Sequence, residues 1–293
     1  MADTRRRYAI VTGANKGIGL EICKQLASNG IFVVLTSRDE NRGIEAVGKL
    51  KNSGISDVVF HQLDVMNPSS ISSLADFIKT QFGKLDILVN NAGISGVTVD
   101  ADGLKKMEEY DARKENPGFE EIMIETYEMA EECLKTNYYG VKAITKALIP
   151  FLEQSNSARI VNVSSTSGKL KNIPDEKVKE IFSNIDELTE ERIDEVLNLF
   201  LKDFKEGLLK TKGWPTWSAY TISKAALNAY TRILARKLPS FRVNCVCPGY
   251  VKTDITYGTG LLTVEEGAKD PVMAALLPDD GPSGVFFFRG KGF

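Results

Sequence analysis

The stretch Thr12-Gly13-Ala14-Asn15-Lys16-Gly17-Ile18-Gly19 lies between an apolar run that begins near Tyr8 and an amphipathic stretch that continues to Ala27. This order predicts a strand, a tight turn and a helix. Gly13 allows a backbone conformation that a Cβ hinders, while Gly17 and Gly19 leave room beside the first turn of the helix. Because the amino end of a helix attracts negative charge, the turn is typical of a pyrophosphate site. A nucleotide-hydrolysing P-loop is disfavoured, since its second glycine would fall on Ile18.

Strand and helix patterns alternate along the rest of the chain. Further strands are predicted at about 31–36, 58–60, 87–89, 160–163 and 243–246, and helices at about 39–51 and 69–82. Such alternation favours a parallel sheet with helices on both faces. We therefore expect an α/β fold with a doubly wound, Rossmann-like sheet. No internal boundary is evident, so residues 1–293 are expected to form a single dinucleotide-binding domain.

Two segments interrupt the alternation. Residues 96–122 are mostly polar, and residues 168–217 contain an amphipathic stretch in which apolar side chains recur at helical spacing from Ile193 to Phe204. We expect both insertions near the active site, at the edge of the sheet where ligands bind, with the second forming a partly helical cap. The alternative is that the second insertion only extends the core.

Composition limits the class of protein. The 293 residues are 43% hydrophobic and 26% charged, with a formal net charge of -2, which gives no overall field for holding nucleic acid. There is no apolar leader and no run of roughly 20 apolar residues that would span a bilayer, so we expect a cytoplasmic protein without a membrane partner. Four cysteines and one histidine predict buried free thiols rather than a disulfide framework or a metal site.

The residues after the second predicted strand bear on the cofactor. An arginine at this place accommodates the extra phosphate of NADP, whereas an acidic residue binds the ribose hydroxyls of NAD. Arg38, together with Lys16 in the glycine turn, favours NADP. Asp39 leaves the choice open, because a shift of one residue in the loop would exchange the two side chains. Both are also compatible with plain surface charge.

Tyr220 and Lys224 open the helix that is predicted to start near Ser218. Their spacing of four places them on one helical face, one turn apart. A free tyrosine has a pKa near ~10, and a neighbouring ammonium favours its anionic form, so the pair is suited to proton transfer. A Tyr-x-x-x-Lys pair by itself arises often by chance and is usually a surface pair, so its meaning depends on what accompanies it.

The accompanying motifs carry a resemblance. The set consists of residues 12–19, Asn90-Asn91-Ala92-Gly93, Asn137, Ser165, residues 220–224 and Pro248-Gly249. In order and setting it resembles the short-chain dehydrogenase/reductase family over nearly the whole chain. Residues 159–165, 188–192 and 279–284 look most similar to the plant branch whose members reduce alkaloid ketones of the salutaridine type and ketones of the menthol pathway.

The resemblance implies a role for each catalytic position. Tyr220 would protonate the carbonyl oxygen during reduction, and Lys224 would lower the tyrosine pKa and bind the nicotinamide ribose. Ser165, rather than Ser164, would hold the substrate oxygen. Asn137 would fix a helix break and a water. Each has a plainer alternative as a structural polar residue, but the joint occurrence of all of them makes that interpretation improbable.

The resemblance also implies a cofactor site. Asp64 would contact adenine, Asn91 the adenine-side ribose, and Thr253 the nicotinamide, although Asp64 and Asn91 are also suited to hydrogen bonds within turns. The cofactor-binding residues expected are Gly13, Asn15, Lys16, Gly17, Ile18, Gly19, Arg38, Asp64, Val65, Asn91, Tyr220, Lys224 and Thr253.

The function implied is reduction of a cyclic, mostly apolar ketone, monoterpenoid or alkaloid, with NADPH. Alternatives are an alcohol dehydrogenase or an enone double-bond reductase on the same scaffold, or a non-catalytic NADP-sensing protein. The insertion at 168–217 would fold over the substrate and cover the helix surface through which relatives pair, so we expect a monomer. Four aromatic residues are candidates for an apolar pocket, although core packing explains them equally: Trp214, Trp217, Tyr250 and Tyr257.

Overall fold

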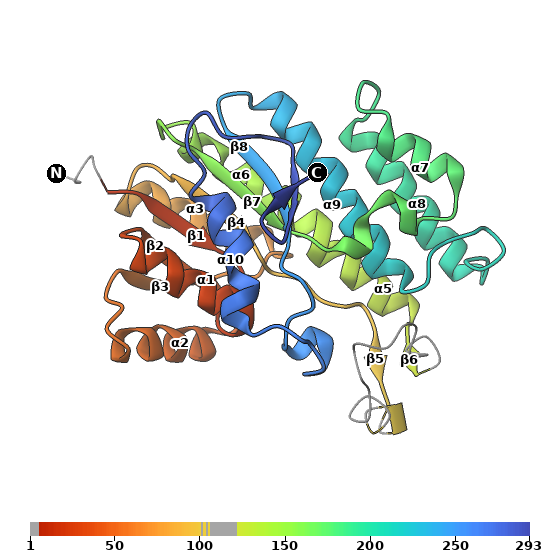
Figure 1. Cartoon of the computed structure of the whole chain (residues 1–293), viewed down its shortest axis with the longest axis horizontal. Coiled ribbons are helices and arrows are strands. Elements are labelled where there is room, and N and C mark those ends of the chain that lie inside the picture. Colours follow the sequence, from red (N-terminus) through yellow and green to blue (C-terminus); the bar gives the residue numbers. More distant parts are fainter. Residues whose placement is uncertain (1–5, 101, 104, 106–121) are drawn as a thin grey trace.

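A computed structural model describes residues 6–100, 102–103, 105 and 122–293 (Figure 1). Its central feature is an eight-stranded sheet in the order β10-β9-β8-β7-β4-β1-β2-β3. The strands are β1 (Tyr8–Val11), β2 (Phe32–Ser37), β3 (Val58–Gln62), β4 (Ile87–Asn90), β7 (Arg159–Val163), β8 (Arg242–Cys247), β9 (Phe286–Phe288) and β10 (Lys291–Gly292). All neighbours pair in parallel except β9 and β10. The doubly wound α/β fold expected from the sequence is therefore confirmed.

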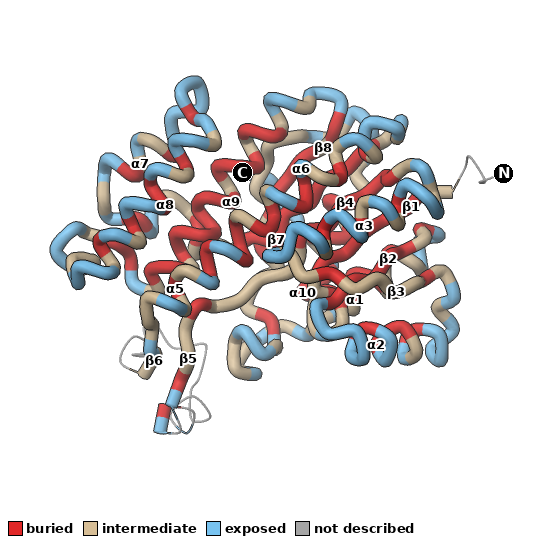
Figure 2. Tube along the Cα trace, turned by 180° about the vertical axis from the view of Figure 1, so that it is seen from behind, coloured by how far each residue is buried: buried red, intermediate tan, exposed pale blue. Residues whose placement is uncertain are grey.

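Helices cover both faces of the sheet, and each face has its own apolar core (Figures 1 and 2). One face carries α1 (Gly17–Ser28), α2 (Glu40–Asn52) and α10 (Val264–Ala275). The other carries α3 (Pro68–Gln81), α6 (Val141–Leu152) and α9 (Ser218–Lys237). Strands covered on both sides read as nearly continuous apolar runs, and β1 and β4 are buried along their whole length.

A π-helical segment, η2 (Lys135–Gly140), interrupts the long helix made by α5 (Tyr127–Leu134) and α6. The sequence interpretation expected Asn137 to sit at a helix break, and the residue lies inside this segment, fully buried. Such π-helical turns are often found at functional sites.

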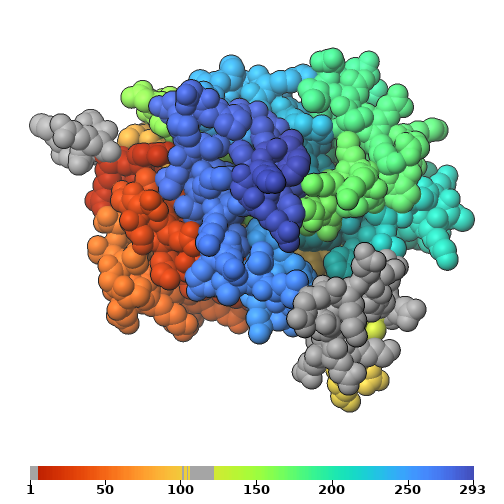
Figure 3. Space-filling model, viewed as in Figure 1, coloured from red at the N-terminus to blue at the C-terminus, as the bar shows by residue number. Residues whose placement is uncertain are grey.

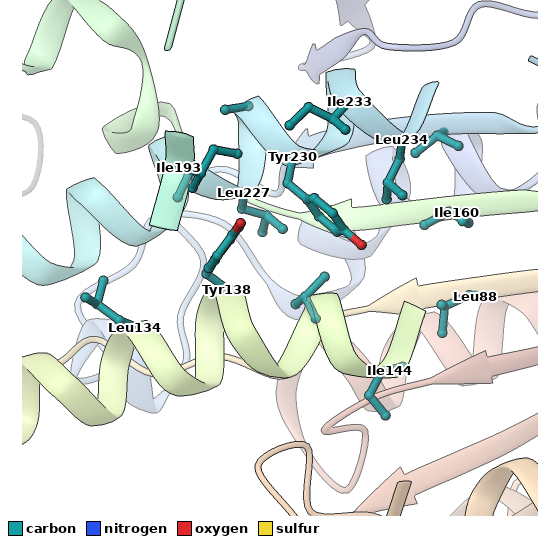
Figure 4. Close-up of a cluster of buried hydrophobic side chains, with 14 of the residues drawn as sticks. Leu88, Leu134, Tyr138, Ile144, Ile160, Ile193, Leu227, Tyr230, Ile233 and Leu234 are labelled. Atoms are coloured by element: carbon teal, nitrogen blue, oxygen red, sulfur yellow. The ribbon is translucent and has the colours of Figure 1, made fainter. Parts of the chain in front are cut away.

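The insertion at 168–217 is partly helical, as expected, and forms α7 (Glu176–Ser183) and α8 (Glu190–Lys205). Figure 3 shows its surface, green to teal, along one side of the molecule. The apolar side of α8 packs against α5 and α9, and Figure 4 shows Ile193 of α8 in one cluster with Tyr138 of η2 and Leu227 of α9. The helix thus extends the core of this face, which was the second interpretation of the pattern. A capping role for the segment stays a prediction.

The first insertion, about 96–122, lies mostly outside the described residues. Its two ends pair as β5 (Thr98–Val99) and β6 (Met123–Ile124), which run antiparallel in a separate small sheet.

The carboxyl-terminal hairpin β9–β10 extends the sheet beyond β8. Lys169, in the turn after β7, fastens this hairpin, because its Nζ lies 4.7 Å from the ring centroid of Phe293 and 5.2 Å from that of Phe286. No helix within the described part of the chain is both long and apolar enough to cross a membrane.

Candidate active site

The predicted site residues gather at the carboxyl edge of the sheet. The glycine turn follows β1, Arg38 follows β2, and Asp64 follows β3. Asn91 follows β4, while Ser165 follows β7 and Thr253 lies in the loop after β8. Ligands of open α/β sheets bind in the crevice at this edge, where the order of strands reverses. In this chain the reversal lies between β1 and β4, directly beside the glycine turn.

The glycine turn is shaped by close backbone contacts. Gly13 has a φ of 61°, and a Cβ there would come within 2.9 Å of Ala92 Cα. A Cβ on Gly19 would lie 2.5 Å from Asn91 Nδ2, so Gly19 serves the packing of the turn on the loop after β4 rather than the approach of a ligand. Asn91 Nδ2 donates to the carbonyl oxygens of Thr12 at 2.9 Å and Gly13 at 3.2 Å. Its observed role is to brace the turn.

The start of α1 fits a phosphate group. The helix begins at Gly17, and its N-cap residue Lys16 makes no side-chain capping hydrogen bond. The first-turn N–H groups therefore lack the side-chain acceptor that a helix start usually has, and a phosphate oxygen supplies one. A Cβ built on Gly17 would meet only Thr253 Cγ2, at 3.6 Å, which leaves the approach open and places Thr253 beside the turn. Asn15 and Ile18 line the same turn, half-buried.

Charged residues frame this approach. Lys16 is exposed and forms an ion pair with Asp254, which lies in the loop after β8. Asp39 is the N-cap of α2, where its Oδ1 accepts a hydrogen bond from Arg42 N at 2.9 Å. The carboxylate is thus engaged at the start of a helix, and Arg38 is exposed directly before it. This arrangement favours the NADP interpretation of the loop over the NAD interpretation.

Asp64 and Val65 follow β3. Asp64 Oδ1 accepts from Met66 N at 3.0 Å. The carboxylate therefore makes a hydrogen bond within the turn after β3, which was the alternative role for this residue. Val65 packs on the π-helical segment, since a Cβ on Gly140 would come within 2.9 Å of Val65 Cγ2.

Tyr220 and Lys224 lie together on α9. Lys224 Nζ is 5.7 Å from the centroid of the Tyr220 ring and donates to the carbonyl oxygen of Val163 at 2.9 Å. A Cβ on Gly93 would lie 3.5 Å from the same Nζ, so the ammonium reaches the loop after β4. The two groups thus face the edge of the sheet that carries the glycine turn.

Ser165 is brought to this pair by packing that bridges the long insertion. The turn after β7 lies against the backbone of α9, because a Cβ on Gly168 would come within 2.5 Å of the Lys224 carbonyl carbon. Asn228 Nδ2 donates to Gly168 O at 3.0 Å, and Ser164 Oγ donates to Asn228 Oδ1 at 2.6 Å. Ser164 is therefore used to hold the turn. Ser165 is half-buried and lies close enough to the phenol of Tyr220 to lower its pKa.

The electrostatics of the pair differ from the expectation in one respect. Burial raises the pKa of Tyr220 above its usual value, and the nearby Ser165 hydroxyl offsets the rise only in part. Burial also lowers the pKa of Lys224 to about 8. The sequence interpretation had the ammonium lowering the tyrosine pKa, but in the protein alone desolvation of the phenol outweighs every favourable contribution. Tyr220 is therefore protonated at neutral pH.

Asn137 connects the catalytic helix to the loop after β4 through hydrogen bonds. Its Oδ1 accepts from Ile94 N at 2.9 Å, and its Nδ2 donates to Ile94 O at 2.9 Å and to Ser223 Oγ at 3.0 Å. Ser223 Oγ in turn donates to Tyr220 O at 2.8 Å. Sequence reasoning missed Ser223, although its place one turn after the tyrosine was an available signal. It also missed Gly168, for which the sequence contained no signal.

The aromatic residues that were candidates for an apolar pocket lie partly in the core and partly in loops. Trp214 is buried in the insertion, where its Nε1 donates to Asp203 Oδ2 at 2.9 Å, so it is core packing. Tyr257 Oη donates to Val97 O at 3.3 Å and Tyr250 Oη bonds with Thr259, both in the loop after β8. Trp217 begins α9. All four cysteines are free and buried, as predicted.

Comparison with known proteins shows what this arrangement belongs to. A short chain dehydrogenase family model matches residues 7–175, and an Enoyl-(Acyl carrier protein) reductase model matches residues 208–273. Salutaridine reductase of Papaver somniferum is 62% identical, covering 97% of this chain and 94% of that protein. Its solved structure superposes with a TM-score of 0.92 at 61% identity, over 97% of this chain and 100% of that one.

Two further relatives carry the names of other reductases or dehydrogenases. The (+)-neomenthol dehydrogenase of Arabidopsis thaliana is 60% identical, over 99% of this chain and 98% of that protein. Carbonyl reductase [NADPH] 1 of Rattus norvegicus is 39% identical, over 96% and 95%. Together with the convergence of Tyr220, Lys224 and Ser165, these matches show that the chain belongs to the short-chain dehydrogenase/reductase family, in the plant branch indicated by its sequence, and is an oxidoreductase of carbonyl or hydroxyl groups.

Proposed function

We propose that this oxidoreductase reduces the carbonyl group of a cyclic, mostly apolar ketone, of the monoterpenoid or alkaloid type, with NADPH. The observation that carries the proposal is the convergence of Tyr220, Lys224 and Ser165 beside an uncapped helix start at the carboxyl edge of the sheet. The substrate class is supported by relatives named for salutaridine and neomenthol, and the cofactor by the relative named for NADPH.

Bound NADPH supplies the hydride. Tyr220 gives its proton to the carbonyl oxygen as negative charge develops there, and Ser165 donates a hydrogen bond to the same oxygen. Lys224 stabilises the phenolate that remains, because its ammonium lies within reach of the ring. Tyr220 carries its proton at neutral pH, as a proton donor in reduction must, although burial makes the phenol a weaker acid than a free tyrosine in the protein alone.

The remaining cofactor contacts are part of the same proposal. Arg38 and Lys16 grip the ribose phosphate of NADPH, Asp64 and Val65 lie against the adenine, and Thr253 helps to hold the nicotinamide. The chain works as one dinucleotide-binding domain with its insertions near the active site. We place it in the cytoplasm of a plant cell, in secondary metabolism.

Replacing Tyr220 with phenylalanine tests the mechanism. General acid catalysis contributes roughly 10²- to 10⁴-fold, so Tyr220→Phe should lower kcat for ketone reduction at least ~100-fold while leaving NADPH binding intact. NADPH oxidation is followed with menthone, salutaridine and isopiperitenone, and binding by NADPH fluorescence. Tyr230→Phe, in the buried part of the same helix, is the matched control and should keep wild-type turnover.

The same assay separates the alternatives. Turnover by Tyr220→Phe equal to that of the wild-type protein would show that the phenol takes no part in the reaction. NADPH binding without turnover of any panel compound by the wild-type protein would favour the sensor. Because isopiperitenone carries a double bond conjugated with its carbonyl, the identity of its product distinguishes carbonyl reduction from double-bond reduction.

A second experiment tests the cofactor contacts. Hydrogen bonds to a charged group contribute about 1.5–3 kcal/mol each, so the double variant Lys16→Gln, Arg38→Gln should weaken NADPH binding by at least roughly tenfold while changing NADH binding little. Lys49→Gln, near the far end of α2, controls for the loss of positive charge. An unchanged preference for NADPH over NADH would show that these two side chains do not hold the phosphate.

A further inference from the structure

The first turn of α9, which carries Tyr220, does not begin in the ordinary way. Its N-cap residue, Trp217, has a left-handed backbone with φ 51° and ψ 53°, a region that non-glycine residues seldom adopt. Trp217 supplies no side-chain capping hydrogen bond to the helix. The first N–H groups of a helix have no partner within the helix and need an acceptor from elsewhere.

Glu125 supplies that acceptor from a distant part of the chain. Its Oε1 accepts from Ala219 N at 2.9 Å, and its Oε2 accepts from Ser218 Oγ at 2.7 Å. Glu125 stands between β6 and α5, and the next residue, Thr126, caps α5 through Met129 N. The carboxylate is therefore held at a fixed point and bonds two consecutive residues of α9. A negative charge at the amino end of a helix is also favoured by the helix dipole.

The two hydrogen bonds end immediately before the catalytic side chain. Ala219 and Ser218 are buried, and Tyr220 follows them directly. On the other side of Tyr220, Ser223 Oγ donates to Tyr220 O at 2.8 Å and itself accepts from Asn137 Nδ2. The backbone of Tyr220 is thus held from two directions, by Ser223 with Asn137 and by Glu125.

We propose that Glu125 is a positioning residue for ketone reduction, which fixes the first turn of α9 and thereby aims the Tyr220 phenol at the substrate oxygen. The inference deepens the proposed function and rests on it. Trp217, at the start of the helix, has a left-handed conformation that non-glycine residues adopt only when their surroundings hold it, and the two hydrogen bonds to the Glu125 carboxylate hold the residues that follow it directly. Glu125 lies three residues after the first insertion, directly after β6, so the inference also links this region to the catalytic helix.

Kinetics of Glu125 variants test the proposal. Misplacement of a catalytic group by about 1 Å costs up to ~100-fold, so Glu125→Ala should lower kcat roughly ten- to hundredfold, with the Kd for NADPH unchanged within about twofold. Glu125→Gln should recover most of the loss, because its amide oxygen still accepts from Ala219 N, and its amide nitrogen can donate to Ser218 Oγ in place of the bond that Glu125 Oε2 accepts from that hydroxyl. Glu128→Ala, an exposed glutamate three residues further along, should behave as wild type. The assay uses the panel ketone with the highest kcat/KM.

Each possible result supports or contradicts the role proposed for Glu125. An unchanged kcat for Glu125→Ala overturns the inference. The inference also fails if Glu125→Ala and Glu125→Gln both lose kcat and both lose NADPH binding, because that pattern indicates general destabilisation. If Glu125→Ala does not fold, Glu125→Asp, too short to bond both groups at once, must show the selective fall in kcat. Tyr220→Phe is measured alongside. Full activity of Tyr220→Phe refutes the proposed function itself, whereas an inactive Tyr220→Phe beside a fully active Glu125→Ala refutes only the role of Glu125.

Discussion

Lys224 holds a positive charge in the interior, with 4% of its surface exposed and its Nζ bonded to the carbonyl oxygen of Val163. Burial lowers its pKa from 10.5 to about 8. Below pH 8 both the folded and the unfolded chain carry the proton, so the full cost of the buried charge is present. Between pH 8 and 10.5 only the unfolded chain keeps it, and the cost fades as the pH rises. The site thus retains a destabilising group for the sake of its chemistry.

Lys224→Met should therefore stabilise the fold while abolishing activity. Each pKa unit corresponds to about 1.4 kcal/mol, and part of the gain is lost because Val163 O loses its partner, so we expect the free energy of unfolding at pH 7 to rise by about 1–3 kcal/mol. The difference from wild type should shrink between pH 8 and 10. Urea unfolding at pH 7 and pH 9.5 measures both, with the exposed Lys212→Met as control. A less stable Lys224→Met at pH 7 would contradict the cost assigned to the buried ammonium.

At the scale of elements, the sequence was sufficient to predict the positions of most strands of the sheet. Strands β1, β2, β3, β4, β7 and β8 all lie within a residue or two of their predicted ranges. They were predictable because a strand buried on both faces needs an unbroken apolar run, and no other local requirement competes with it. The strand β9 was missed, although its three phenylalanines also form an unbroken apolar run. Its place is set by pairing with β8 and by Lys169.

The candidate site was predictable as a set of motifs but not as a geometry. The spacing of Tyr220 and Lys224 already placed them on one helical face. The approach of Ser165 to Tyr220, in contrast, depends on the contact of Gly168 with the backbone of α9, which no local pattern encodes. The cap that Glu125 provides for α9 is likewise a contact between distant segments. The effect of burial on the pKa of Tyr220 was not predictable, because burial cannot be read from spacing.

At the scale of the whole molecule, the second insertion determines which surface remains for a partner. Helix α8 lies over α5 and α9 and is fastened by ion pairs as well as by its apolar side. Lys142 of α6 binds Asp194 at 2.9 Å and Glu190 at 3.4 Å, and Lys237 of α9 binds Glu190 at 2.6 Å. A symmetric dimer that pairs through α5 and α9 would need this face to be free on both copies, and here the insertion covers it. We propose a monomer on this ground.

Light scattering after size exclusion tests the proposal, with a single species near 32.3 kDa expected for the wild-type chain. The double variant Glu190→Lys, Asp194→Lys replaces attraction by repulsion from Lys142 and Lys237, so α8 should loosen and uncover apolar surface on α5 and α9. Apolar patches of this kind drive association, and the variant should therefore form dimers or larger species. Glu187→Lys, exposed on the same insertion, changes the net charge in the same sense and should stay monomeric. A wild-type protein of twice the chain mass would show that another surface mediates pairing and that covering the α9 face does not decide the oligomeric state.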